Sequence, residues 1–144
     1  GWIAALIVGR IINPRRGMAA LAGVSMGFWG VPLGLDHTVT YNTLLYGFSA
    51  GLLDAPLATG LPLRRPWGAA VAGVIVHVGK FGFVLINVWV SGIVRRFVVF
   101  GVAAALGNHI LFGALGGVLG WAVWRSGSTL ARRARPPQRS LEPL

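Results

Sequence analysis

The chain has 144 residues, of which 55% are hydrophobic and only 11% are charged, whereas soluble domains usually carry about a quarter charged residues. This composition, with 22 glycines spread through long apolar runs, favours an integral membrane protein over a soluble domain. The net charge of +10 does not indicate nucleic-acid binding, because the arginines separate apolar segments instead of lining one face. The sequence has no cysteine, which excludes disulfides and thiolate metal sites.

Five apolar runs follow one another along the chain, at residues 1–12, 17–35, 44–60, 68–90 and 97–124. The breaks between them carry turn-forming sequences, which are NPRRG at 13–17, DHTVTYNT at 36–43 and LPLRRPWG at 61–68. We therefore predict an all-α, polytopic transmembrane helix bundle over residues 1–126, with about five helices. Because the chain starts at Gly1 without a methionine, we expect the first of these helices to be truncated.

The arginines at the breaks predict the orientation, since Lys and Arg next to a membrane span favour the cytoplasmic side. Alternation through the spans puts nine arginines on one side: Arg15, Arg16, Arg64, Arg65, Arg125, Arg132, Arg133, Arg135 and Arg139. Only Arg95 and Arg96 fall on the other side. We expect a multi-pass protein of the cytoplasmic membrane with residues 36–43 facing outward. Residues 127–144 are basic, polar and proline-containing, and we predict a disordered cytoplasmic tail.

The stretch LYGFSAGLLDAP, residues 45–56, contains the G-x-S-x-G pattern of a serine nucleophile elbow, centred on Ser49. Such an elbow needs a sharp turn from a strand into a helix, but this pattern lies inside an apolar helical stretch. Gly47 and Gly51 also form a GxxxG pair, which lets helices approach closely in lipid. The last apolar run repeats this spacing, at Gly113 with Gly117 and at Gly116 with Gly120. We predict that Ser49 packs or hydrogen-bonds locally and that the chain is not an enzyme.

A rhomboid-like intramembrane serine protease is the remote alternative. That family needs a serine and a histidine borne on helices, and NHILFGALGG at 108–117 offers His109. The chain departs from the family at both places. The family's serine resembles G-x-S-G, where this chain has Ser49-Ala50-Gly51, and Phe112 stands where a glycine is expected after the histidine.

Polar residues within the run at 68–90 are the main functional signal, because an ionisable group costs about 2.5–3.5 kcal/mol at the centre of a membrane helix. His77, Lys80 and Asn87 share one helical face. Lys80, the only lysine, lies about 18 Å along the helix from Gly68, at about 1.5 Å per residue. Two roles stay open for Lys80: an ion pair with Asp54 or a cation that faces a ligand.

Further polar and aromatic residues are candidates for the walls of an outward-facing pocket. Asn108 and His109 lie together in the last apolar run, and Trp29, Tyr41 and Trp89 offer stacking surfaces near the outer end. We predict neither a metal site nor a cofactor. The three histidines lie on different elements, without the local spacing of metal ligands.

Four glycine-rich stretches follow one another over roughly residues 4–125: ALIVGRIINPRRGMAALAGV, TLLYGFSAGLLDAPL, GAAVAGVIVHVGKFGFVL and GNHILFGALGGVLGWAVWR. In this succession the chain resembles the substrate-binding S components of energy-coupling factor (ECF) transporters, which are prokaryotic vitamin and micronutrient importers. The resemblance implies a six-helix membrane protein, with an upstream helix missing here, that captures a small molecule on the outer side. It also implies a membrane coupling subunit and ATPase subunits as partners.

The predicted function is therefore substrate capture by a membrane subunit of an importer. In this hypothesis Lys80 supplies the cation, and the hydrogen-bonding partners of the ligand are His77, Asn87, Asn108 and His109. The alternative is a non-transport scaffold, because the chain is also similar in texture to the rod-shape-determining D family of small helical membrane proteins. A scaffold has no reason to keep a buried cation facing a cavity, so tightly packed polar residues without a void would favour it.

Overall fold

The computed structural model describes residues 1–30, 32–33, 39–55, 58, 60–90 and 98–133. Within these residues the chain is all-helical, with five α-helices, one 3-10 turn and no strand. The elements are α1 (Trp2–Ile12), α2 (Met18–Gly30), α3 (Val39–Gly51), η1 (Leu52–Asp54), α5 (Pro66–Val90) and α6 (Val98–Arg133). The all-α prediction is confirmed for this part of the chain.

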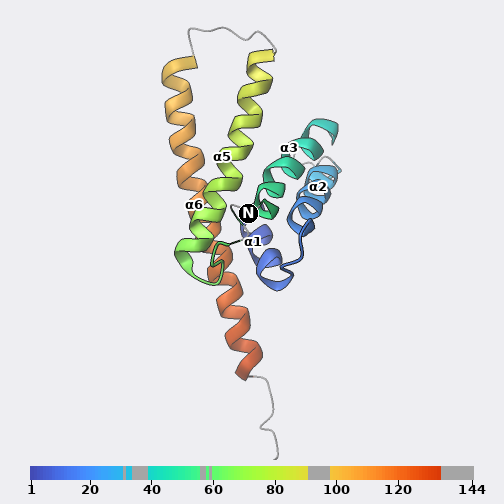
Figure 1. The fold of residues 1–144 in the computed structure, drawn as a ribbon, viewed down its shortest axis with the longest axis vertical. Helices are drawn as coiled ribbons and strands as arrows, with labels where there is room; N and C mark the ends of the chain where they lie inside the picture. Colours follow the sequence, from blue (N-terminus) through green and yellow to red (C-terminus); the bar gives the residue numbers. More distant parts are fainter. Residues whose placement is uncertain (31, 34–38, 56–57, 59, 91–97, 134–144) are drawn as a thin grey trace, which may run out of the picture.

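Two antiparallel helix pairs make up the molecule, and α1 lies between them (Figure 1). The long helices α5 and α6 form one pair, and the shorter helices α2 and α3 form the other. Helix α1 packs chiefly on α6 and also contacts α2 and α5. The C-terminal half of α6 extends beyond the other helices (Figure 1).

The helices differ in whether they are long enough to cross a membrane. Segments Pro66–Ile86 of α5 and Gly101–Arg132 of α6, of 21 and 32 residues, are both long and apolar enough to do so. By contrast, α2 and α3 have 13 residues each, or about 20 Å at about 1.5 Å per residue, against about 30 Å for a bilayer core. Two of the expected spans therefore contain helices shorter than a bilayer crossing.

Helix α3 differs most from the sequence-based expectation of an apolar run over 44–60. It begins at Val39, so the polar residues 40–43 form its first turn instead of an outer loop, and Asn42 among them is buried. It ends at Gly51 and continues only as the 3-10 turn η1. Ala55 has an extended backbone, which is the conformation that a residue preceding a proline favours, and Pro56 thereby explains the early end.

Glycines lie where the helices approach most closely. A Cβ atom at Gly23 or Gly27 of α2 would meet the backbone of α3, and one at Gly47 would meet Val24 of α2. The two glycine pairs of α6 contact different helices. Gly113 and Gly117 face α5, whereas Gly116 and Gly120 face α1. The prediction that the GxxxG pairs allow close helix packing is confirmed.

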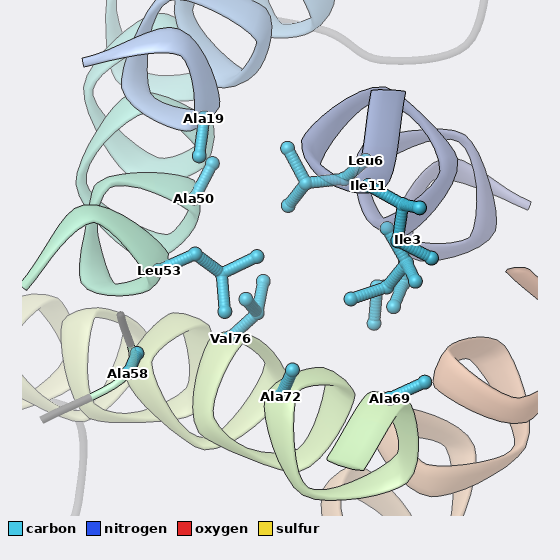
Figure 2. Close-up of a cluster of buried hydrophobic side chains, with 11 residues drawn as sticks. Ile3, Leu6, Ile11, Ala19, Ala50, Leu53, Ala58, Ala69, Ala72 and Val76 are labelled. Carbon is cyan, nitrogen blue, oxygen red and sulfur yellow. The ribbon is translucent and has the colours of Figure 1, made fainter. Parts of the chain in front are cut away.

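The core lies where α1, η1 and α5 meet, and it combines Ile and Leu side chains with alanines. In Figure 2, Leu53 of η1 and Val76 of α5 point toward each other, and the aliphatic side chains of α1 lie across from them. The buried cluster consists of Ile3, Leu6, Ile7, Ile11, Ala19, Ala50, Leu53, Ala58, Ala69, Ala72 and Val76. Ala69 and Ala72 of α5 are fully buried, and their small side chains allow the neighbouring elements to lie close to this helix.

Helix α6 continues through Arg133, so that residues 127–133, which the sequence assigns to the tail, are helical. The hydroxyl groups of Ser128 and Thr129 donate to the carbonyl oxygen of Arg125, a local bond that a helix accommodates. The first proline of this region is Pro136. The remaining tail, residues 134–144, lies outside the described residues.

Candidate functional site

The only lysine and two aromatic side chains form the centre of the candidate site. Lys80 on α5 donates a hydrogen bond from Nζ to the hydroxyl oxygen of Tyr46 on α3, at 3.2 Å. Its ammonium group lies 4.5 Å from the centroid of the Tyr46 ring and 6.0 Å from that of Trp2 on α1, which is the range of cation–π attraction. Trp2 and Tyr46 pack edge to face with ring centroids 4.9 Å apart. Three helices thus contribute to one charged aromatic cluster.

Two histidines adjoin this cluster from α5 and α6. His77 lies one turn before Lys80, and its Nδ1 is 3.0 Å from the carbonyl oxygen of His109. Because a carbonyl only accepts, this nitrogen carries the hydrogen. The two imidazole rings lie 4.7 Å apart, and Phe81 lies 5.0 Å from the His109 ring. The Nδ1 atom of His109 is buried and has no hydrogen-bond partner among the described residues, so it is open to a polar group that enters the cluster.

Asp54 takes no part in the cluster, because it pairs with Arg10 and not with Lys80. Its Oδ1 atom lies 3.6 Å from Nη2 of Arg10, slightly longer than a hydrogen bond, and its Oδ2 accepts the backbone N–H of Ala20 at 3.0 Å. The early end of α3 leaves this carboxylate beside α1 and the start of α2. The position of Lys80 in the fold therefore does not depend on a carboxylate from the described part of the chain.

A cavity of about 450 Å³ opens directly beside the cluster. We call it the tryptophan cavity, and it is lined by Trp2, Ser25, Met26, Gly27, Trp29, Gly30, Leu33 and Tyr46. Trp2 and Tyr46 separate it from Lys80, since each ring has Lys80 as one neighbour and the cavity as another. Its walls are mostly apolar, with the Tyr46 hydroxyl as the polar group nearest to the lysine.

The structure gathers some of the residues expected from the sequence and separates others. Lys80, His77 and His109 meet in the cluster, and Trp29 lines the cavity. Tyr41 instead packs on Phe83 of α5, with ring centroids 5.6 Å apart. The side chain of Asn87 lies outside the described residues.

Two further expected residues face away from the cluster. Asn108 is exposed, because successive helical residues point about 100° apart and its neighbour His109 is the one turned toward α5. Trp89 is 81% exposed and lies about 14 Å along α5 from Lys80 at about 1.5 Å per residue. Both therefore differ from the expectation that they wall the same pocket.

Trp2 and Tyr46 are the functional candidates that sequence reasoning missed. Aromatic residues in apolar runs usually indicate packing, and neither residue is near Lys80 in the sequence. The only local signal is the position of Tyr46 in LYGFSAG, one residue before the glycine that brings α3 against α2. Its contact with Lys80 arises from the crossing of α3 and α5.

Ser49 lies in the interior of α3, is fully buried, and donates its hydroxyl hydrogen to the carbonyl oxygen of Leu45 at 2.6 Å. The prediction of a local hydroxyl bond is confirmed. The strand-to-helix turn of a nucleophile elbow does not occur here, because helix precedes and follows this serine.

Comparisons with protein families, with curated protein sequences and with solved structures gave no match to this chain.

Proposed function

We propose that this chain is a polytopic membrane protein that captures a small molecule in the tryptophan cavity, with Lys80 as the cation that attracts it. One observation carries the proposal. The ammonium group of Lys80 lies against the two aromatic rings that wall the cavity, in the middle of an apolar helix and without a carboxylate partner in the described chain. A charge in such a segment is costly, so its presence there indicates a functional role.

The surface of α6 supports a membrane setting. Large apolar side chains on successive turns of this helix are about half exposed, among them Leu111, Phe112, Leu115 and Leu119. A continuous apolar surface of this kind needs cover, and lipid provides it. Together with the arginines at one end of the helices, it supports insertion in the cytoplasmic membrane, with the C-terminal tail inside and the tryptophan cavity toward the outer side.

The chemistry of the cavity indicates the class of ligand. Its volume of about 450 Å³ suits a small molecule, and its aromatic walls favour a flat or apolar body. The Tyr46 hydroxyl, which accepts a hydrogen bond from Lys80, can donate its own hydrogen to a carboxylate, a phosphate or a polar heterocycle at one end of that body, and the positive charge of Lys80 behind the ring favours an anionic group at that end. Such a ligand is compatible with the S-component resemblance, in which the chain hands its substrate to a membrane coupling subunit driven by ATPase subunits.

Native mass spectrometry of the full-length protein, gently purified from its membrane, tests this proposal. We expect a bound metabolite at one copy per chain, lost in Lys80→Met and retained in Trp89→Phe, a matched control in the same helix but outside the cavity. Co-purifying ATPase subunits would support the transport role. An empty wild-type protein, or a metabolite that survives Lys80→Met, would contradict the proposal.

A membrane scaffold is the second candidate, and the internal bonding of the cluster favours it. The hydrogen bond from Lys80 to Tyr46 joins α5 to α3, and the one from His77 to the carbonyl oxygen of His109 joins α5 to α6. These polar groups therefore also act as cross-links between helices. If that is their role, Lys80→Met lowers stability without any ligand to lose, and morphogenesis proteins co-purify in place of ATPases.

A further inference from the structure

A second cavity, of about 540 Å³, lies at the opposite end of the bundle. We call it the arginine cavity, and it is lined by Arg10, Ile11, Pro14, Arg16, Ala58, Leu61, Pro62, Leu63, Arg64 and Arg65. Helix α1 connects the two cavities, since Trp2 lines the first and Arg10 the second, about 12 Å apart along the helix at about 1.5 Å per residue. The two cavities are therefore separate sites.

The charge of the arginine cavity is largely uncompensated. Four arginines line it, and Asp54 is the only carboxylate side chain among the described residues. Asp54 faces Arg10 alone, at 3.6 Å. Four like charges around one cavity repel each other, and an anion between them removes that repulsion.

The arginines are held in place by contacts that leave donors available. Arg10 is 8% exposed, and its Nη1 donates to the carbonyl oxygen of Arg15 at 2.9 Å, which closes the turn between α1 and α2. The carbonyl oxygen of Arg64 accepts a hydrogen bond from Nε1 of Trp121 at 2.9 Å. The guanidinium group of Arg64 lies 5.8 Å from the centroid of the Trp124 ring. Two helix connections are thus fixed beside one buried charge, which pre-organises the cavity for a ligand.

The remaining walls are apolar, with Ile11, Leu61 and Leu63 facing the same space as the arginines. Guanidinium groups match the oxygens of a phosphate through paired hydrogen bonds. Trp67, Trp121 and Trp124 at this end of α5 and α6 are typical of the headgroup level of a membrane. Basic pockets between helices on the cytoplasmic side bind phospholipid headgroups.

We propose that the arginine cavity binds the phosphate of an anionic ligand, with Arg16, Arg64 and Arg65 on the phosphate oxygens and the apolar wall against the rest of the molecule. An anionic phospholipid and a soluble phosphate ester share this chemistry. Buried Arg10 supplies positive charge from the floor, and Asp54 keeps its guanidinium in position.

Native mass spectrometry of the full-length protein released from nanodiscs tests this site. The wild-type protein should retain phosphatidylglycerol in preference to the zwitterionic phosphatidylcholine. Arg64→Gln/Arg65→Gln should weaken that binding by about tenfold or more, because each lost bond to a charged group has an effect of this order. The matched control is Arg125→Gln/Arg132→Gln, which removes the same charge from α6 outside the cavity and should stay close to wild type.

Competition with inorganic phosphate and with glycerol phosphate separates the two sources of ligand. Displacement of the lipid by these probes supports a site that binds the phosphate group alone. Retention of the lipid supports a site whose binding also depends on contacts with the acyl chains. The proposal is overturned if the wild-type protein shows no preference for phosphatidylglycerol and binds neither probe, or if both double variants lose binding equally. The wild-type comparison stands even if a variant fails to fold, and the Lys80→Met test of the tryptophan cavity is unaffected by either outcome.

Discussion

Substitution of Gly117 by alanine is a direct test of the helix packing. A Cβ atom there would lie 2.7 Å from the carbonyl carbon of Ala69 and 3.0 Å from the Cα of Ala70, where ordinary carbon contacts are about 3.5–4.0 Å. These atoms belong to the backbone of α5 and cannot rotate away. Helices α5 and α6 must therefore move apart, and overpacking of this kind costs about 1–3 kcal/mol.

Gly107→Ala is the matched control on the same helix, because no heavy atom lies within 4 Å of a Cβ at Gly107. Both substitutions gain the same helix propensity, about 0.8–1.0 kcal/mol, so the difference between the two variants isolates the contact with α5. We expect Gly117→Ala to be less stable than Gly107→Ala by about 1–3 kcal/mol. Equilibrium unfolding in detergent micelles, followed by the helical circular dichroism signal, measures that difference.

Equal stability of the two variants would refute the close approach of α5 and α6 at Gly117. A larger loss at Gly107 than at Gly117 would mean that the outer face of α6 is packed against another surface. Equal stability would also call for a wider helix separation at the His77–His109 contact, because that contact joins the same two helices.

Three further predictions test other parts of the structure. Arg10→Met should destabilise the protein by about 3–5 kcal/mol, because it leaves the partly buried carboxylate of Asp54 uncompensated, and adding Asp54→Asn should recover part of this loss in a double-mutant unfolding cycle, since the bond from Arg10 to the carbonyl oxygen of Arg15 stays lost. Ser49→Ala should lower the unfolding free energy by at most about 1 kcal/mol, since it removes only one local bond to Leu45; loss of a proteolytic activity toward a membrane substrate would instead revive the rhomboid-like alternative. A cysteine at the exposed Thr40 should react with a membrane-impermeant maleimide added outside intact cells, and labelling only from the inside would reverse the proposed topology.

Several features of this protein follow from its sequence alone. The apolar composition and the arginine-containing breaks predict an all-helical chain, and the long runs at 68–90 and 97–124 correspond to α5 and α6. The GxxxG spacings predict close helix packing, and the helical setting of Ser49 predicts its bond to the backbone. These features are local, because hydropathy, glycine spacing and a bond to the preceding turn each depend on residues only a few positions apart.

The tertiary structure decides how the elements combine. It places Tyr46 and Trp2 around Lys80. It pairs Asp54 with Arg10, and it turns His109 toward His77 while Asn108 stays exposed. It also begins α3 within the polar stretch that the sequence assigns to a loop, and it buries the polar side chain of Asn42 there. The sequence contains the residue types, but the rotation of each helix about its axis and the point where two helices cross determine which of them meet. Those quantities depend on close packing between segments that lie far apart in the chain.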